Sequence, residues 1–292
     1  MVLMANSSFL MQIRRDRAVL SLEGAETENF LHNLVTADVL GLTVCQARYG
    51  ALLTPQGKIL FDFFVVKAAE GYLLDCAASQ LDELTKRLMF YRLRAKVSIK
   101  ARPDLEVGVS PDVPDSLKND YLSFADPRTL GMDWHVRRMM GWRLITESGT
   151  LPEGSGYDEQ RIAFGFADSD GDIGSGELFP HEANFDQMGA VSFSKGCYIG
   201  QEVVSRMEHR ATARSRILPV TFDGAAPPRG AAIKSADKIV GSVLSSAGNA
   251  ALALLRLDRM AEATQPLLTD AVRVRLHKPA WIKYDVPSKD YA

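Results

Sequence analysis

The sequence predicts an α+β fold that ends in a small antiparallel β-barrel. Over the first hundred residues, β-rich runs alternate with amphipathic helical stretches in a split β–α–β pattern, and a less regular version recurs over residues 104–195. After Arg216 the chain changes to short β-rich runs separated by glycine, proline and asparagine, which is typical of a small barrel. The change places the last domain boundary near residues 211–216.

The first unit, assigned to residues 1–103, has well-defined signals. Its expected elements are a strand over 18–22, a helix over 25–39, two strands within 51–68, a strand over 71–78, a helix after 79 and a strand over 95–100. Pro55 and Gly57 predict a hairpin turn, because proline fixes φ and glycine tolerates positive φ. Ser79 with Asp82 predicts a capping box at the start of the second helix.

The second unit, assigned to residues 104–212, has weaker signals, and the third covers residues 213–292. In the second unit we expect strands at 105–110 and 134–139 and a helix at 157–165. In the third we expect only short strands, at 216–222, 231–235, 238–246, 250–258 and 271–277.

Charge and cysteine usage narrow the function classes. The chain has 34 Lys and Arg against 36 Asp and Glu, so no general attraction to nucleic acid or anionic lipid is expected. Its first residues lack a long apolar stretch behind a basic segment, which argues against export and membrane insertion. Three cysteines with no CxxC pair fit a reducing compartment and argue against a dedicated zinc or iron–sulfur cage. We therefore expect a cytoplasmic protein.

Asp62 is a carboxylate in an apolar strand. The period of two places it on one face with Phe64, and Phe61 and Phe63 lie on the other. A buried, unpaired carboxylate is costly, so Asp62 needs a donor. That donor is either the backbone or an arginine of the core, or a ligand with N–H groups such as a pterin ring.

Cys197 lies in the stretch 195–206, KGCYIGQEVVSR. A small buried cysteine is one interpretation, since free cysteine is often buried. The other is a reactive or weakly metal-ligating thiol, because Lys195 supplies positive charge and a helix from Gln201 would favour a thiolate with its first-turn amides. Glu202 has its own simple role there, as an acidic residue that complements the helix dipole.

Two further patterns have open or negative interpretations. Arg206, Arg210, Arg214 and Arg216 form either a solvated face or a clamp for carboxylates such as a folate glutamate tail. The five histidines show no metal-ligand spacing, so no permanent metal site is expected.

Three segments together resemble the YgfZ-type folate-binding proteins: residues 195–202, the preceding 178–194 and the earlier 52–65. The mitochondrial counterparts of those proteins are iron–sulfur cluster assembly factors. The resemblance runs from about Leu20 through the C-terminal region. The family is similar in fold to the T-protein of the glycine cleavage system, an aminomethyltransferase that binds tetrahydrofolate between three domains. It implies two tandem ferredoxin-like units around a folate channel, followed by the barrel.

The resemblance also implies roles for residues. Cys197 and Asp62 would carry the chemistry, with Cys197 as a transient iron ligand or redox thiol. The residues implied in folate contact are Asp62, Lys195, Tyr198, Gln201, Glu202 and Arg206. The chain also departs from T-proteins, which have a glutamate near Ala163 and an aromatic residue and an arginine in place of Cys197 and Gln201. A folate pocket without aminomethyl transfer is therefore expected.

The leading hypothesis is an accessory protein that binds tetrahydrofolate, or a one-carbon-substituted folate, and supports iron–sulfur cluster assembly or repair. Its partners would be client enzymes, including radical enzymes that modify tRNA, or assembly proteins, with no direct binding to nucleic acid and no membrane. The alternative is a folate-dependent one-carbon transferase, in which Asp62 handles a proton. A third is a scaffold that uses folate only for stability.

Overall fold

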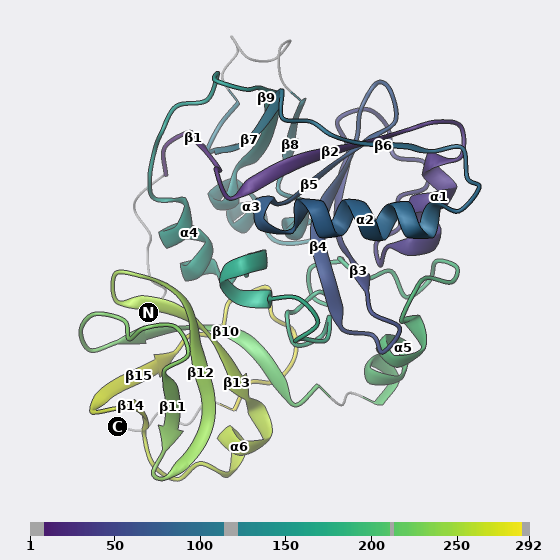
Figure 1. Cartoon of the computed structure of the whole chain (residues 1–292). Coiled ribbons are helices and arrows are strands. Elements are labelled where there is room, and N and C mark those ends of the chain that lie inside the picture. The colour runs from purple at the N-terminus through teal and green to yellow at the C-terminus, as the bar shows by residue number, and fades with distance from the viewer. Residues whose placement is uncertain (1–8, 114–121, 211–212, 288–292) are drawn as a thin grey trace.

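A computed structural model describes residues 9–113, 122–210 and 213–287 of the chain. It contains a five-stranded sheet, a four-stranded sheet and a closed six-stranded barrel. Figure 1 shows the two sheets side by side, with the barrel below them. The predicted α+β fold with a C-terminal barrel is confirmed.

The five-stranded sheet comes from the first part of the chain and has the order β3-β4-β5-β2-β6, with every pair antiparallel. Its elements are β2 (Arg17–Glu23), α1 (Thr27–Leu34), β3 (Ala47–Leu53), β4 (Ile59–Lys67), β5 (Tyr72–Ala77), α2 (Leu81–Arg92) and β6 (Ser98–Ala101). The hairpin turn predicted between β3 and β4 is confirmed, and Gly57 has the positive φ of +82° that it needs.

The two faces of β4 belong to different cores. Phe63 and Val65 pack with residues of α1 and α2, whereas Phe64 and Val66 join the core that also includes the second sheet and the barrel. Asp62 shares a face with Phe64 because side chains alternate along a strand. It therefore points away from the helices and toward the rest of the molecule.

The four-stranded sheet has the order β1-β7-β9-β8. Its elements are β1 (Gln12–Ile13), β7 (Leu105–Ser110), β8 (Leu122–Ala125), α3 (Trp134–Met140), β9 (Trp142–Glu147) and α4 (Tyr157–Phe164). The strand predicted at 134–139 is wrong, because this stretch is α3, whose first turn is capped by the Asp133 carboxylate accepting from the His135 backbone N–H.

The capping box predicted at Ser79 is also wrong. Helix α2 has Gln80 at its N-cap and no capping side chain. The Ser79 hydroxyl instead donates to Asp170 over 2.6 Å. The residue pattern thus marked the right position for a helix start, but a carboxylate far along the chain takes the hydroxyl.

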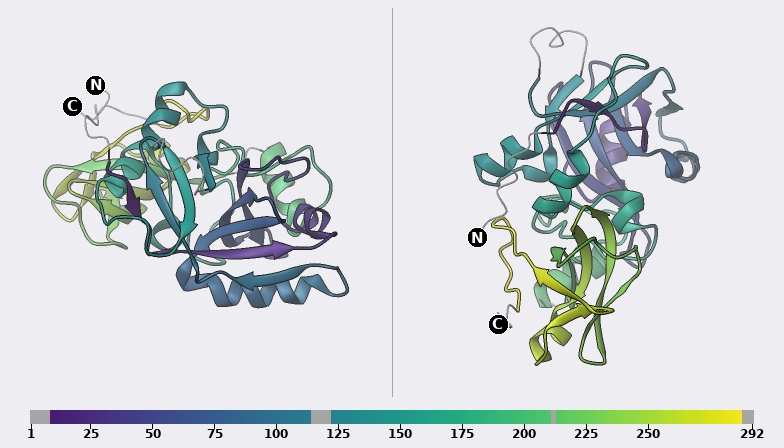
Figure 2. Two further views of the ribbon diagram at one scale, coloured as in Figure 1. Left: turned by 90° about the horizontal axis from the view of Figure 1, so that it is seen from above. Right: turned by 90° about the vertical axis from the view of Figure 1, so that its left-hand side faces the viewer.

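The chain between α4 and the barrel is irregular and ends in α5 (Gln201–Arg210). The barrel closes in the order β10-β13-β12-β11-β14-β15, and Figure 2 shows it at one end of the molecule. Its elements are β10 (Ser215–Phe222), β11 (Ala232–Ser235), β12 (Lys238–Ala247), β13 (Ala250–Arg256), α6 (Leu257–Glu262), β14 (Leu267–Thr269) and β15 (Val272–Leu276). None of the helices in the described ranges is long and apolar enough to cross a membrane.

Candidate functional site

The β3–β4 turn and the KGCYIGQE stretch, two of the sequence motifs, meet in space. Gly200 has a φ of +79°, and a Cβ on it would lie 2.6 Å from the Thr54 carbonyl oxygen. A Cβ on Gly57, in the turn itself, would lie 2.9 Å from the Val203 Cβ. Any side chain at either glycine would push the turn and the start of α5 apart. The two motifs are therefore joined by a contact that only glycine permits.

Lys195 fixes the same stretch to the first unit. Its ammonium donates hydrogen bonds to the backbone carbonyls of His32, Val35 and Ala37, all within 2.9 Å. His32 lies in the last turn of α1 and Val35 is its C-cap, while Ala37 follows two residues later, so the ammonium lies near the helix end where the dipole favours a cation. Burial lowers the pKa of Lys195 to about 8, although Asp38 opposes the shift. The structure therefore gives Lys195 a positioning role.

Tyr198 anchors the stretch from the other side of Cys197. It is buried, its hydroxyl has no partner among the described residues, and burial raises its pKa to about 12. The Lys195 ammonium lies 5.4 Å from its ring centroid. Cys197, by contrast, is a free and exposed cysteine, so the buried-residue interpretation is wrong. The chain is held at 195, 198 and 200 and presents residue 197 to solvent.

One face of α5 is exposed to solvent. Glu202 and Arg206 form an exposed ion pair at 2.6 Å, four residues apart on the helix, and exposed pairs of this kind contribute little to stability. Arg216 instead turns inward and pairs with Asp186. The four arginines of the run therefore do not converge on one clamp.

Asp62 is 2% exposed and is partly satisfied by the protein itself. Its Oδ2 accepts hydrogen bonds from the Tyr49 hydroxyl at 2.8 Å and the Ser169 hydroxyl at 2.9 Å. Its Oδ1 has no partner among the described residues. Burial raises the pKa of Asp62, while Arg17 and these two hydroxyls oppose the shift. A buried polar atom without a partner is uncommon, so this oxygen makes Asp62 a candidate contact for a ligand or a bound water.

A buried ion network, which sequence reasoning missed, surrounds Asp62. Asp168 lies 2.8 Å from Arg14, 3.4 Å from Arg161 and 3.8 Å from Arg128. Burial opposes ionisation of Asp168, but these arginines hold its pKa well below its usual range. Arg14 and Asp168 lie 154 positions apart, and Arg128 and Arg161 come from between them, so no local pattern revealed the network.

The network also joins the two sheets. Asp75 on β5 pairs with Arg17 at 2.7 Å and with Arg143, on β9 of the other sheet, at 2.6 Å. Arg143 additionally lies 3.9 Å above the ring of Phe64. Removing one residue of such a pair is costly, because the residue that remains is then an uncompensated buried charge.

A cavity of about 340 Å³ opens beside this network. Its lining residues are Arg14, Asp16, Arg17, Ala77, Asp158, Arg161, Asp168, Ser169, Asp170 and Gly171. Ser169 lines the cavity and also donates to Asp62, so the Ser169 side chain lies between Asp62 and the cavity. Cys197 does not line this cavity. The structure thus brings Asp62 close to a cavity and places Cys197 elsewhere, on the outer surface.

The fold and the barrel have known counterparts. Residues 214–284 match the family model described as CAF17, C-terminal beta-barrel domain. The whole chain is similar in structure to glycine cleavage system aminomethyltransferase T from Bartonella henselae, with a TM-score of 0.74 and 16% sequence identity over 94% of this chain and 87% of that one. The molecule is therefore a protein of the aminomethyltransferase T fold.

Relatives that align with most of this chain define its family. The iron–sulfur cluster assembly factor IBA57 homolog of Pyricularia oryzae is 32% identical, covering 86% of this chain and 73% of its own length. The human factor IBA57 is 30% identical, covering 82% and 75%, and the mouse factor is 29% identical over the same shares. The chain belongs to the IBA57 family of iron–sulfur cluster assembly factors. Because these relatives are mitochondrial proteins, the expected cytoplasmic location is contradicted.

Proposed function

We propose that this chain supports iron–sulfur cluster assembly in client enzymes, such as the tRNA-modifying radical enzymes, by lending Cys197 as a transient thiolate ligand. The observation that carries the proposal is the exposed thiol on a turn anchored at Lys195, Tyr198 and Gly200. Iron and its clusters favour thiolate ligands. A single thiolate binds weakly and releases easily, which suits transfer to a partner that supplies the other ligands.

The test compares Cys197→Ser with Cys45→Ser, since Cys45 is the other exposed free cysteine. Each variant is expressed in cells that lack the native protein, and the activity of a cluster-dependent enzyme is measured. We expect Cys197→Ser to fail and Cys45→Ser to rescue, with equal amounts of folded protein. Full rescue by Cys197→Ser would remove the thiol from the mechanism.

We further propose that a reduced folate binds next to Asp62. Support comes from the Oδ1 of Asp62, which has no partner among the described residues, and from the adjacent cavity, which is within the size range of small-molecule pockets. Asp62 would accept a hydrogen bond from a pterin N–H, and Ser169 and Tyr49 would hold its other oxygen. The bound folate would supply a one-carbon carrier. In this proposal Lys195 and Tyr198 do not contact the folate; they hold the turn that carries Cys197.

Folate binding is tested by calorimetric titration of the full chain with tetrahydrofolate. Asp62→Ala is expected to weaken binding more than tenfold, about 1.4 kcal/mol, while Asp82→Asn, an exposed change on α2, leaves affinity unchanged. Equal affinities for wild type and Asp62→Ala would exclude Asp62 from the folate site. Formation of methylene-tetrahydrofolate from an aminomethyl donor would identify a one-carbon transferase instead.

A further inference from the structure

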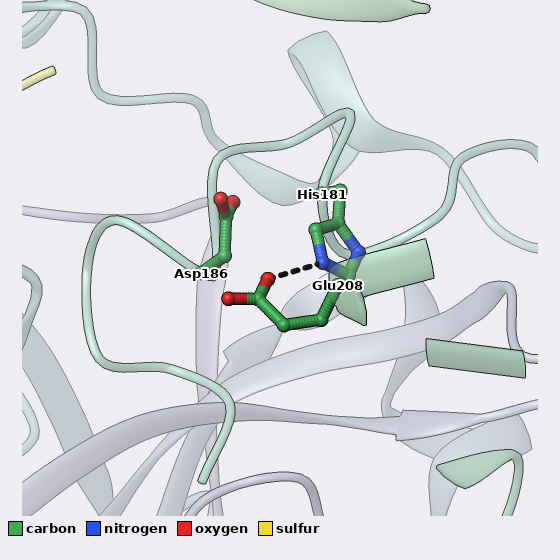
Figure 3. Close-up of side chains that lie close together, drawn as sticks. All are labelled: His181, Asp186 and Glu208. Carbon is green, nitrogen blue, oxygen red and sulfur yellow. Dashed lines mark hydrogen bonds and ion pairs between the residues drawn. The ribbon is translucent and has the colours of Figure 1, made fainter. Parts of the chain in front are cut away.

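His181, Asp186 and Glu208 form a cluster away from both Cys197 and Asp62. Figure 3 shows the three side chains lying close together, with a hydrogen bond between His181 and Glu208. The His181 Nε2 and a Glu208 carboxylate oxygen lie 2.9 Å apart, and one ligand atom from each of the three residues lies within 4.8 Å of the other two. His181 and Asp186 come from the irregular segment before α5, and Glu208 lies in the last turn of α5.

We propose that this cluster binds a divalent transition-metal ion. One imidazole nitrogen with two carboxylates is a ligand set that suits zinc, manganese or iron(II), and the imidazole disfavours magnesium and calcium. Metal–ligand bonds of about 2.0–2.2 Å place tetrahedral ligand atoms about 3.4 Å apart. The Glu208 side chain is 44% exposed and can make this small adjustment, while His181 and Asp186 are held in place by burial.

The imidazole is free to present a lone pair to a metal. The Nδ1 of His181 is buried and has no partner among the described residues. No contact therefore fixes the ring proton on Nε2 except the bond to Glu208. When a metal takes Nε2, the proton can lie on Nδ1.

Arg216 orients the cluster by contacting both Asp186 and His181. Its guanidinium donates to both oxygens of Asp186, at 2.6 and 3.1 Å, and also to the backbone carbonyl of His181. Each carboxylate oxygen retains a second lone pair for a metal, and such outer contacts commonly fix the orientation of metal ligands. Arg216 also neutralises Asp186, which leaves the cluster with one net negative charge when His181 is neutral. The site therefore has little net negative charge, and we expect it to select an ion that forms strong ligand bonds, such as zinc.

A cavity of about 270 Å³ lies against the cluster, lined in part by His181, Glu208, Arg216 and Tyr284. It offers an entry path and space for water to complete the coordination. An ion there would connect the end of α5 to the segment that precedes it and, through Arg216, to barrel strand β10. Helix α5 begins four residues after Cys197, so the ion would also steady the helix behind the exposed thiol.

The test uses the full chain carrying Cys45→Ser and Cys197→Ser, so that neither exposed thiol can contribute, after treatment with a chelator. Calorimetry with ZnCl₂ is expected to show one ion per chain, and CoCl₂ to give visible absorption bands without a thiolate band in the near ultraviolet. Adding Glu208→Gln is expected to weaken zinc binding at least tenfold and to abolish the rise in melting temperature that zinc produces. Glu208 is chosen over His181 because its exposed side chain tolerates substitution.

His209→Gln is the matched control, because His209 is an exposed imidazole on the same turn of α5. It is expected to leave zinc affinity unchanged. The proposal is overturned if zinc shows no saturable binding at one ion per chain, if Glu208→Gln binds as tightly as its parent, if His209→Gln weakens binding as much as Glu208→Gln, or if cobalt gives a thiolate band.

Discussion

Replacing Lys195 with methionine is expected to destabilise the protein by about 3 kcal/mol. The ammonium donates to three carbonyls at the end of α1, those of His32, Val35 and Ala37. A hydrogen bond from a charged donor contributes about 1.5–3 kcal/mol net, but removing the ammonium also removes the cost of taking that charge out of water, the same burial that lowers the pKa of Lys195. We therefore count about 1 kcal/mol for each bond. Methionine keeps the packing of the aliphatic stem, so the loss reports the bonds.

The assay is urea unfolding followed by circular dichroism, with Lys100→Met as the control because Lys100 is an exposed lysine of β6. A loss of 3 kcal/mol corresponds to a fall in melting temperature of roughly 6 °C for a chain of this size. The reaction rate of Cys197 with a disulfide reagent should also rise, since the turn loses an anchor. If Lys195→Met and Lys100→Met unfold at the same urea concentration, the bonds to α1 do not hold the turn.

Two other predictions follow from the same geometry. Gly200→Ala should destabilise the chain by at least about 2 kcal/mol in urea, because alanine is strained at a φ of +79° and its Cβ would lie 2.6 Å from the Thr54 oxygen; an unchanged midpoint would contradict the close contact. The second concerns pH: burial raises the pKa of Asp62 above its ordinary value of 3.8, so the folded protein keeps this proton to higher pH than the unfolded chain. Stability therefore falls as pH rises through that window, by up to about 1.4 kcal/mol per unit, and urea midpoints from pH 4 to 7 should fall for wild type relative to Asp62→Asn. A difference independent of pH would show that Asp62 ionises normally.

The fold was largely predictable because most strands carry their own local signal. The stretch 134–139 was wrongly predicted as a strand, because Trp134 and Val136 alternate with polar residues. The Asp133 cap and Gly141 at the C-terminal end, with a φ of +67°, instead define a helix. Strand β14 was not predicted, since its three residues pair only with β11 and β15 when the barrel closes.

The site was predictable only where its chemistry is local. The segment around Cys197 was recognised because its residues are consecutive in one octapeptide. The partners of Lys195 were not, because they lie about 160 positions earlier in the chain. The need of Asp62 for donors followed from its apolar neighbours, whereas Tyr49 and Ser169 as those donors are set by tertiary structure. The wrong compartment has a simple cause: cysteine usage reports how reducing an environment is and does not distinguish one reducing compartment from another.

The structure separates the buried charged residues around Asp62 from the exposed thiol of Cys197, and the proposed cluster transfer has to work with this separation. Asp168 and Asp75 are paired with arginines, so these buried charges are compensated within the chain, whereas Asp62 Oδ1 has no partner among the described residues. Cys197 is exposed, lies between the anchored residues Lys195 and Tyr198, and can offer one sulfur ligand. One thiolate cannot retain a cluster that needs four protein ligands. Under the proposed function, cluster affinity is therefore a property of the complex with a partner, and the partner that contributes more ligands sets the direction of transfer.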